Sequence, residues 1–221
     1  MFAVDHAATA LLIKRRFPTV SMTPLLFSVQ AMELAWVGLN YGGVERTTTG
    51  PIVRTVADIH LAYMPYSHSV ATGAGAALLA WLIVEKGLGH RLLGRAVAIG
   101  IVSHLILDLI THAADIALWP GVSAPKLGLG LYDRAPMWGF ALEVIYGVLC
   151  WWIYRGRRSL LAVIVLGNLA NITLFSAAIA GPEQYLAGRP LLIVTFVFVQ
   201  IVTMLMLVGL FARPSAVSAK G

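Results

Sequence analysis

The chain has 221 residues, of which 59% are hydrophobic and only 12% carry a charged side chain. Soluble domains carry about a quarter charged residues, so this composition excludes an ordinary water-facing surface and indicates a membrane protein. The single cysteine, Cys150, excludes a disulfide scaffold and any metal site built from several cysteines,.

The first apolar stretch, Phe2 to Ile13, predicts a short N-terminal helix that cannot cross a bilayer alone at ~1.5 Å per residue. The basic cluster Lys14–Arg16 follows this stretch. A signal peptide has the opposite order, so we expect no cleavage.

Six longer apolar segments follow, each close to the ~20 residues that a helix needs to span the hydrocarbon. Because only helices satisfy their own backbone in lipid, we expect an all-α, polytopic transmembrane bundle forming a single membrane domain, 1–221. Within it, 1–154 would hold the polar residues and 155–221 would add two transmembrane helices. The six predicted spans run from Thr23 to Tyr41, Tyr66 to Val84, Ala96 to His112, Pro136 to Tyr154, Leu160 to Ala180 and Pro190 to Phe211.

Basic residues predict the orientation, because cytoplasmic loops are enriched in lysine and arginine. Eleven of the sixteen basic residues fall in four clusters that alternation places on one side: Lys14–Arg16, Lys86–Arg95, Arg155–Arg158 and Arg213–Lys220. We therefore expect a multi-pass protein of the inner (cytoplasmic) membrane with a cytoplasmic C-terminus. This placement explains the net charge of +6 without nucleic-acid binding, for which no basic face with interleaved aromatic residues is present,. The loops Gly42–Pro65 and Ala113–Ala135 would face outward.

Glu33, His104, Asp108 and Glu143 lie within predicted spans, where an acid costs about 2.5–3.5 kcal/mol unless it is paired, hydrated or bound to an ion. No lysine or arginine occurs at the same depth, which indicates a bound metal or shared protons. Counting ~1.5 Å per residue places these four and His6 near one level. His68 comes out higher, unless the chain turns at Pro65-Tyr66.

His104, Asp108 and His112 are spaced four residues apart and share one helix face. Imidazole and carboxylate together suit zinc and other divalent first-row metals. Two alternatives stay open for these residues. His112 caps the end of its helix, and Glu143 pairs with Arg134 or accepts a hydrogen bond from Tyr146.

Other polar residues favour simpler interpretations. His60 in a loop and His90 among basic residues are expected in solvent. Asn168, Asn171 and Gln200 are expected to bond between helices.

The segment Ser103–His112 (SHLILDLITH), running on to Leu118-Trp119-Pro120, resembles the membrane-bound metal-dependent hydrolase family, also described as LexA-binding, inner-membrane-associated hydrolases. His6 matches the family's early histidine, and Ser67-His68-Ser69 stands for its Thr-His-Ser step. Met32-Glu33-Leu34 occupies the place of a Pro-Asp-x-Asp motif, and Met64-Pro65-Tyr66 replaces an arginine that commonly precedes the histidine step. The tracts 58–69 (DIHLAYMPYSHS) and 128–132 (GLGLY) resemble an uncharacterised branch, and the resemblance covers Val4 to Tyr154.

This resemblance implies a membrane-embedded, zinc-type hydrolase acting on a lipid ester or phosphodiester. Its implied metal ligands, for one ion or two, are His6, Glu33, His68, His104 and Asp108. Glu143 would be general base or would orient a ligand histidine, and His112 or Tyr66 would steady the leaving group.

Three alternatives stay open. Intramembrane acids and histidines also build ion or proton pathways. A haem or diiron oxidase centre is the second, although six histidines, two of them expected in solvent, are too few for a His-box diiron pattern. Haem would need a facing pair such as His6 and His104. A structural subunit is the third, since the almost wholly apolar span Pro190–Phe211 suits lipid or a partner helix.

Overall fold

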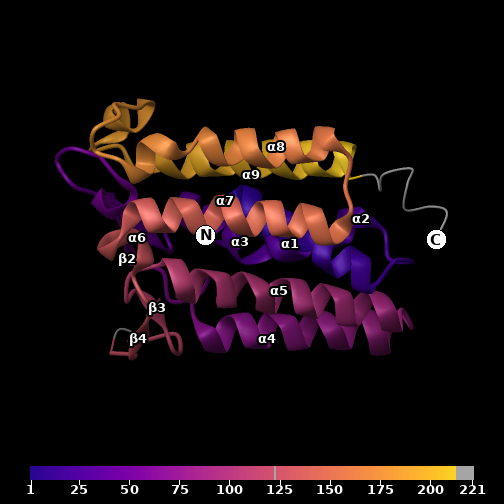
Figure 1. Cartoon of the computed structure of the whole chain (residues 1–221). Helices are drawn as coiled ribbons and strands as arrows, with labels where there is room; N and C mark the ends of the chain where they lie inside the picture. The colour runs from indigo at the N-terminus through magenta and orange to yellow at the C-terminus, as the bar shows by residue number, and fades with distance from the viewer. Residues whose placement is uncertain (122, 213–221) are drawn as a thin grey trace.

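In the computed structural model, which describes residues 1–121 and 123–212, long helices lie side by side and two short hairpins gather at one end of them (Figure 1). The first half of the described chain contains α1 (Ala3–Arg16), α2 (Met22–Val29), α3 (Ala31–Tyr41), β1 (Arg46–Thr49), the 3-10 turn η1 (Val56–Asp58), β2 (Ile59–Tyr63), α4 (Val70–Trp81), the π-helical turn η2 (Leu82–Gly87) and α5 (Arg91–Thr111). The second half contains β3 (Ile116–Ala117), β4 (Lys126–Leu127), α6 (Leu131–Arg134), α7 (Pro136–Tyr154), α8 (Arg158–Leu169), the 3-10 turns η3 (Ile172–Phe175) and η4 (Pro182–Leu186), and α9 (Pro190–Phe211).

Within residues 1–121 and 123–212, four helices are long and apolar enough to cross a membrane, which agrees with a membrane protein of the all-α class. They are α4 continued by η2, α5, α7 and α9, at the positions of four predicted spans. The predicted basic cluster Arg213–Lys220 lies outside the described residues.

The prediction of six continuous spans is not borne out, because two of the apolar segments are interrupted. The segment Thr23–Tyr41 breaks at Gln30 into α2 and α3, which meet at 55° and count as a fifth span only if taken together.

The segment Leu160–Ala180 is α-helical only as far as Leu169, and the resulting helix α8 is too short to span by itself. Asn168 and Asn171 donate side-chain hydrogen bonds to the carbonyls of Ile164 and Gly167 at this end. Asparagine competes for backbone groups in this way and favours helix ends, a property that apolar content does not reveal.

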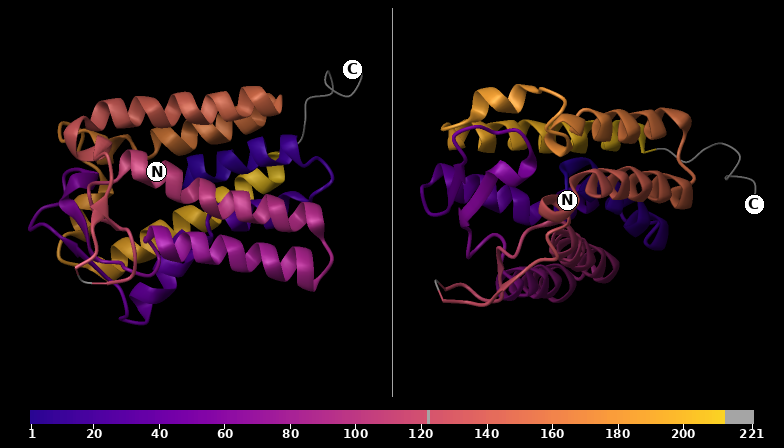
Figure 2. Two further views of the ribbon diagram at one scale, coloured as in Figure 1. Left: turned by 90° about the horizontal axis from the view of Figure 1, so that it is seen from below. Right: turned by 60° about the vertical axis from the view of Figure 1, so that its left-hand side comes forward.

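Helix α1 runs through the interior of the bundle, packed against α2, α5, α7, α8 and α9 (Figures 1 and 2). Nearly all its residues up to Ile13 are buried, and the small side chains of Ala7, Ala8 and Ala10 let neighbouring helices approach closely. This position carries Asp5 and His6 into the interior.

A close approach between α5 and α2 fixes the position of the helix break. A Cβ added at Gly100 would lie 2.8 Å from the Cβ of Ser28 and closer still to its hydroxyl, so only glycine fits. The contact holds the end of α2 beside the half of α5 that carries His104 and Asp108.

Both predicted outward loops form antiparallel hairpins at the same end of the bundle, β1 with β2 and β3 with β4. The second loop also closes the end of α5, because Leu129 and Gly130 donate backbone hydrogen bonds to Leu109 and His112. Gly128 adopts φ +145° directly against Ala113, a position that an L side chain cannot share,. The loop thereby holds His112 at the end of the helix.

Candidate metal centre

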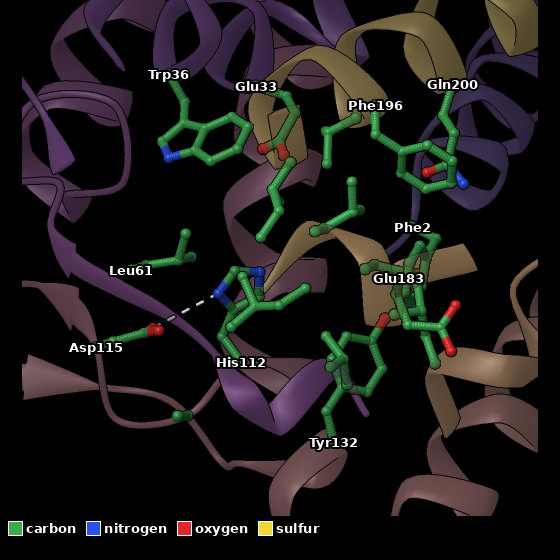
Figure 3. Close-up of a pocket in the computed structure, with 18 of the residues that line it drawn as sticks. Phe2, Glu33, Trp36, Leu61, His112, Asp115, Tyr132, Glu183, Phe196 and Gln200 are labelled. Atoms are coloured by element: carbon green, nitrogen blue, oxygen red, sulfur yellow. Dashed lines mark ion pairs between the residues drawn. The ribbon is translucent and has the colours of Figure 1, made fainter. Parts of the chain in front are cut away.

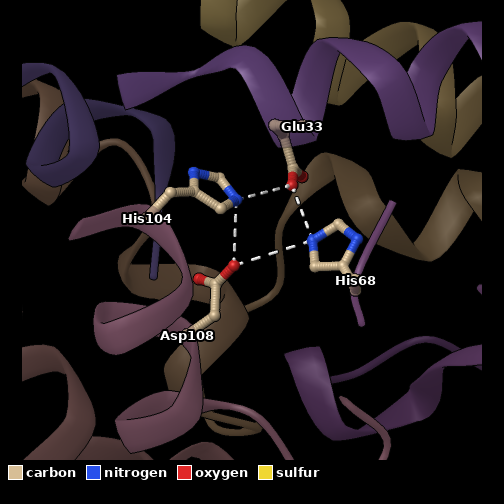
Figure 4. A group of neighbouring side chains, drawn as sticks. All are labelled: Glu33, His68, His104 and Asp108. Atoms are coloured by element: carbon tan, nitrogen blue, oxygen red, sulfur yellow. Dashed lines mark hydrogen bonds and ion pairs between the residues drawn. The ribbon is translucent and has the colours of Figure 1, made fainter. Parts of the chain in front are cut away.

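Four side chains from three separate parts of the chain converge where α3 meets α5 (Figure 4). They are Glu33 at the start of α3, His68 in the turn before α4, and His104 and Asp108 one turn apart on α5. His68 Nε2 lies 3.1 Å from Glu33 Oε2 and 3.6 Å from Asp108 Oδ2. His104 Nε2 lies 3.7 Å from Glu33 Oε2 and 3.0 Å from Asp108 Oδ2.

These separations fit a single tetrahedral ion. Bonds of about 2.0–2.2 Å from zinc to nitrogen and oxygen place neighbouring ligand atoms roughly 3.3–3.5 Å apart, and all four atoms lie within 4.8 Å of one another. His104 Nε2 and Asp108 Oδ2 are fully buried and have no hydrogen-bond partner among the described residues, although they are 3.0 Å apart. Two acceptors that face a common point without bonding each other suit a cation between them.

The helix break orients His104. Val29 is the last residue of α2, so its carbonyl lacks the partner that a continuous helix would supply. His104 Nδ1 lies 2.9 Å from that oxygen. Because a carbonyl only accepts, Nδ1 carries the proton and Nε2 keeps its lone pair towards the centre.

A chain of hydrogen bonds orients His68 in the same sense. Its Nδ1 lies 2.8 Å from the Ser67 hydroxyl, which donates to Glu45 at 2.5 Å. Glu45 also accepts the backbone N–H groups of Tyr66 and Ser67, at 2.8 Å each. Since the Ser67 hydroxyl has one proton and gives it to Glu45, it accepts from Nδ1–H of His68 and leaves Nε2 free to bind metal.

The turn Pro65–His68 resolves the depth of His68 that the sequence left open. The predicted span from Tyr66 is not helical at its start, since α4 begins only at Val70, and the turn brings the imidazole to the level of Asp108.

Burial lowers the pKa of His68, but the adjacent Glu33 carboxylate outweighs this effect and raises the pKa above its ordinary value.

Asp108 presents its second oxygen, Oδ1, to two further histidines. His6 Nε2 lies 3.1 Å from Oδ1 and His112 Nε2 lies 3.7 Å from it. The nitrogen of Met1 is 2.6 Å from the same oxygen. His6 is therefore beside the four-atom group through Asp108, and is not one of its members.

His112 is the C-cap residue of α5, as the capping alternative predicted, and also contacts the centre. Its Nδ1 lies 3.5 Å from Asp115 Oδ1. The rings of His6 and His104 stack with centroids 4.0 Å apart, which leaves no room for a porphyrin between these two histidines.

Glu143 is fully buried but lies outside the four-atom group. Its oxygens accept from the Tyr132 hydroxyl and from the backbone N–H of Phe2, at 3.3 Å for the latter. Burial, and then the Glu143 carboxylate, raise the pKa of Tyr132 well above its ordinary value, so the phenol stays a donor. The alternative pairing with Tyr146 is wrong, since that hydroxyl contacts Thr9.

A cavity of about 150 Å³ adjoins the centre (Figure 3). Glu33 belongs to both, and His112 lines the cavity and faces Asp108. Its walls come from the N-terminal segment, α3, the first hairpin region, the end of α5, α6, η3, η4 and α9. Most of its surface is apolar, and Phe2, Trp36, Leu61 and Phe196 contribute side chains to it.

Among the remaining predicted residues, His60 and His90 are exposed, as expected. Gln200 on α9 donates to Asn171 at 2.7 Å, which confirms their bonding between helices. Tyr66 is 43% exposed and does not line the cavity, so the structure gives no support to a role with the leaving group.

Sequence reasoning missed Glu45 and Glu183. Both are acids in loop or short-turn segments without apolar periodicity, where a solvated side chain is the ordinary expectation. Both are nevertheless buried, at 2% and 3% exposure. The sequence indicated a role only for Glu45, because this residue lies in the same hairpin region as the Ser-His-Ser step and precedes it.

Comparison of the chain with protein-family models, with curated proteins and with solved structures finds no match. The site is therefore interpreted from its own geometry.

Proposed function

We propose that this protein is a membrane-embedded, metal-dependent hydrolase whose ion is bound by Glu33, His68, His104 and Asp108. The observation that carries the proposal is a set of four convergent ligand atoms beside a largely apolar cavity. An ion held only for structure or storage needs no adjoining cavity, whereas a catalytic site needs room for substrate beside the metal.

Zinc is the proposed metal, because two imidazoles and two carboxylates at these separations match its ligand types and bond lengths. Other divalent first-row metals share this preference. His6 would support the centre through Asp108 or bind a second ion at Oδ1.

A divalent cation supplies Lewis-acid activation of water and of the bond to be cleaved. The protein supplies the remaining functions. His112 lines the cavity and faces Asp108, so it is placed to take up a proton from water and return it to the leaving group,. Glu143 is not a ligand of the metal, and it acts as a positioning residue that fixes Tyr132 and Phe2 in the cavity wall.

The proposed substrate is a lipid ester or phosphodiester, since the cavity is mostly apolar and lies within a bundle of membrane-crossing helices. We further propose the inner membrane as location, a cytoplasmic C-terminus and membership of the membrane-bound metal-dependent hydrolases. Helix α9, with many exposed apolar side chains, would contact lipid or a partner helix.

The test is metal content and ester hydrolysis of protein purified in detergent. We expect the wild type to retain about one equivalent of zinc or more, and the His104→Ala/Asp108→Ala double variant to lose both metal and activity. His90→Ala, which removes an exposed histidine, serves as the matched control. Unchanged metal content in the double variant would refute the site, and retained metal without hydrolysis of any ester would refute the enzyme.

A further inference from the structure

The charged side chains that line the cavity are acids, and the Met1 ammonium group, which also lines it, lies 2.6 Å from Asp108. Among the described residues that line it, the acids are Glu33, Asp115, Asp133 and Glu183, and none is lysine or arginine. His112 is the lining imidazole, and it faces Asp115. Proteins that bind phosphate usually surround it with arginine, lysine or convergent backbone N–H groups.

The metal does not reverse this balance. A divalent cation and the Met1 ammonium group, set against Glu33 and Asp108, leave the centre with one positive charge in excess. The three other lining acids, Asp115, Asp133 and Glu183, outnumber that charge, so a phosphodiester anion would enter a space that stays negative,.

Glu183 is the most deeply buried of the four lining acids. It is 3% exposed, its Oε2 accepts from the Thr173 hydroxyl at 3.0 Å, and its Oε1 has no partner within the part of the chain that the structure describes. The described residues place no basic side chain within 4.0 Å of it. A Cβ added at Gly181 would lie 2.5 Å from Oε1, so the glycine makes room for the carboxylate.

A buried carboxylate without a cation is costly, because burial removes its hydration and nothing replaces it. An ammonium group from a ligand would supply the missing positive charge. The cavity that Glu183 shares with Glu33 also offers apolar surface from Trp36, Leu61, Ile193, Phe196 and Val197. The indole N–H of Trp36 is buried without a partner among the described residues.

We propose that Glu183 is a specificity residue that pairs with an ammonium group of the substrate, and that the substrate is a carboxylic ester of a cationic amphiphile with one hydrocarbon chain. This inference rests on the proposed hydrolase function and narrows its substrate class, because it excludes phosphodiesters. In the reaction, water adds to the acyl carbon and the bond from that carbon to the ester oxygen breaks. The products are a carboxylic acid and an alcohol, whose oxygen takes the proton through His112.

Binding is tested first, with amphiphiles that have no bond to cleave. Octyltrimethylammonium, octyl sulfate and uncharged octyl glucoside are titrated calorimetrically, below their micelle concentrations, into protein held in lipid nanodiscs. We expect the wild type to bind the ammonium at least about tenfold more tightly than the sulfate, which is at the lower end of the coupling between two close opposite charges. Equal or tighter binding of the sulfate overturns the inference without requiring any variant.

Glu183→Gln keeps the shape of the side chain and removes its charge. We expect it to weaken ammonium binding about tenfold while leaving octyl glucoside binding unchanged. Asp133→Asn removes an exposed acid of the same cavity and is the matched control, expected to change ammonium binding by less than about threefold,. Wild-type ammonium binding by Glu183→Gln overturns the assignment.

Turnover is measured separately with decanoylcholine and with bis(p-nitrophenyl) phosphate. Metal-dependent hydrolysis of the choline ester supports both proposals. Preferred hydrolysis of the phosphodiester overturns the proposed class of cationic carboxylic esters but supports the hydrolase function. Glu183-dependent ammonium binding without hydrolysis of either compound overturns the hydrolase and leaves the recognition site standing.

Discussion

Two buried serines flank His68, and substituting each of them distinguishes an effect on metal affinity from an effect on folding stability. Ser67 Oγ bonds His68 Nδ1, whereas Ser69 Oγ accepts the backbone N–H of Thr72 and caps α4. Both are almost fully buried, at 1% and 0% exposure. Replacing each by alanine deletes one hydroxyl group, two residues apart, and so compares a partner of a metal ligand with a helix cap.

Ser67→Ala removes the hydrogen bond that holds Nδ1 protonated and leaves Glu45 with its two backbone donors. Loss of such a partner costs about 10–100-fold in metal affinity, or roughly 1.4–2.7 kcal/mol. Ser69→Ala removes an N-cap, which costs about 1 kcal/mol of folding stability. Because its hydroxyl does not contact His68, we expect metal affinity to change by less than about threefold.

The assay is a zinc titration against a competing chelator at fixed pH, together with thermal unfolding of the metal-free proteins in detergent. The expected result is a weaker affinity for Ser67→Ala and a lower melting temperature for Ser69→Ala. Wild-type zinc affinity in Ser67→Ala, or equal losses in both variants, would refute the orientation of His68 by Ser67 and Glu45.

Three further predictions concern packing, the buried acid and pH. Gly100→Ala forces α2 away from α5 and should lower stability by about 1–3 kcal/mol, measured as thermal unfolding, with Gly75→Ala, which meets nothing within 4 Å, as control. Tyr132→Phe leaves the buried Glu143 with fewer donors and should cost about 1–3 kcal/mol, with unchanged metal content by mass spectrometry because neither residue is a ligand. A metal-bound imidazole must be unprotonated, and the pKa of His68 is raised,. Apparent metal affinity should therefore not change with pH above that pKa. It should then fall up to about tenfold per unit as pH drops through that raised pKa; a zinc titration from pH 5 to 9 that shows no decline would contradict this.

Local patterns determined much of the fold. The span Pro190–Phe211 was predicted at its observed bounds, because a long uniform apolar run between proline and polar residues has one stable conformation in lipid,. The spacing of His104 and Asp108 likewise fixed two ligands on one helix face.

Interruptions of apolar segments were beyond this reasoning. Hydropathy does not reveal that Asn168 and Asn171 end α8, or that the chain breaks at Gln30. Both effects depend on which polar groups find partners in three dimensions. The break at Gln30 supplies the Val29 carbonyl that orients His104, so an error in the predicted helix concealed part of the site.

The sequence by itself determined that the chain is a helical membrane protein and which polar residues are too costly to leave unpaired in it. Only the tertiary structure decided that Glu33, His68, His104 and Asp108 share one point, that His6 lies beside it and that Glu143 belongs to Tyr132. The physical reason is that burial cost belongs to each residue and can be inferred from its neighbours in the chain. The partner that offsets this cost is set by how helices and turns far apart in sequence pack together.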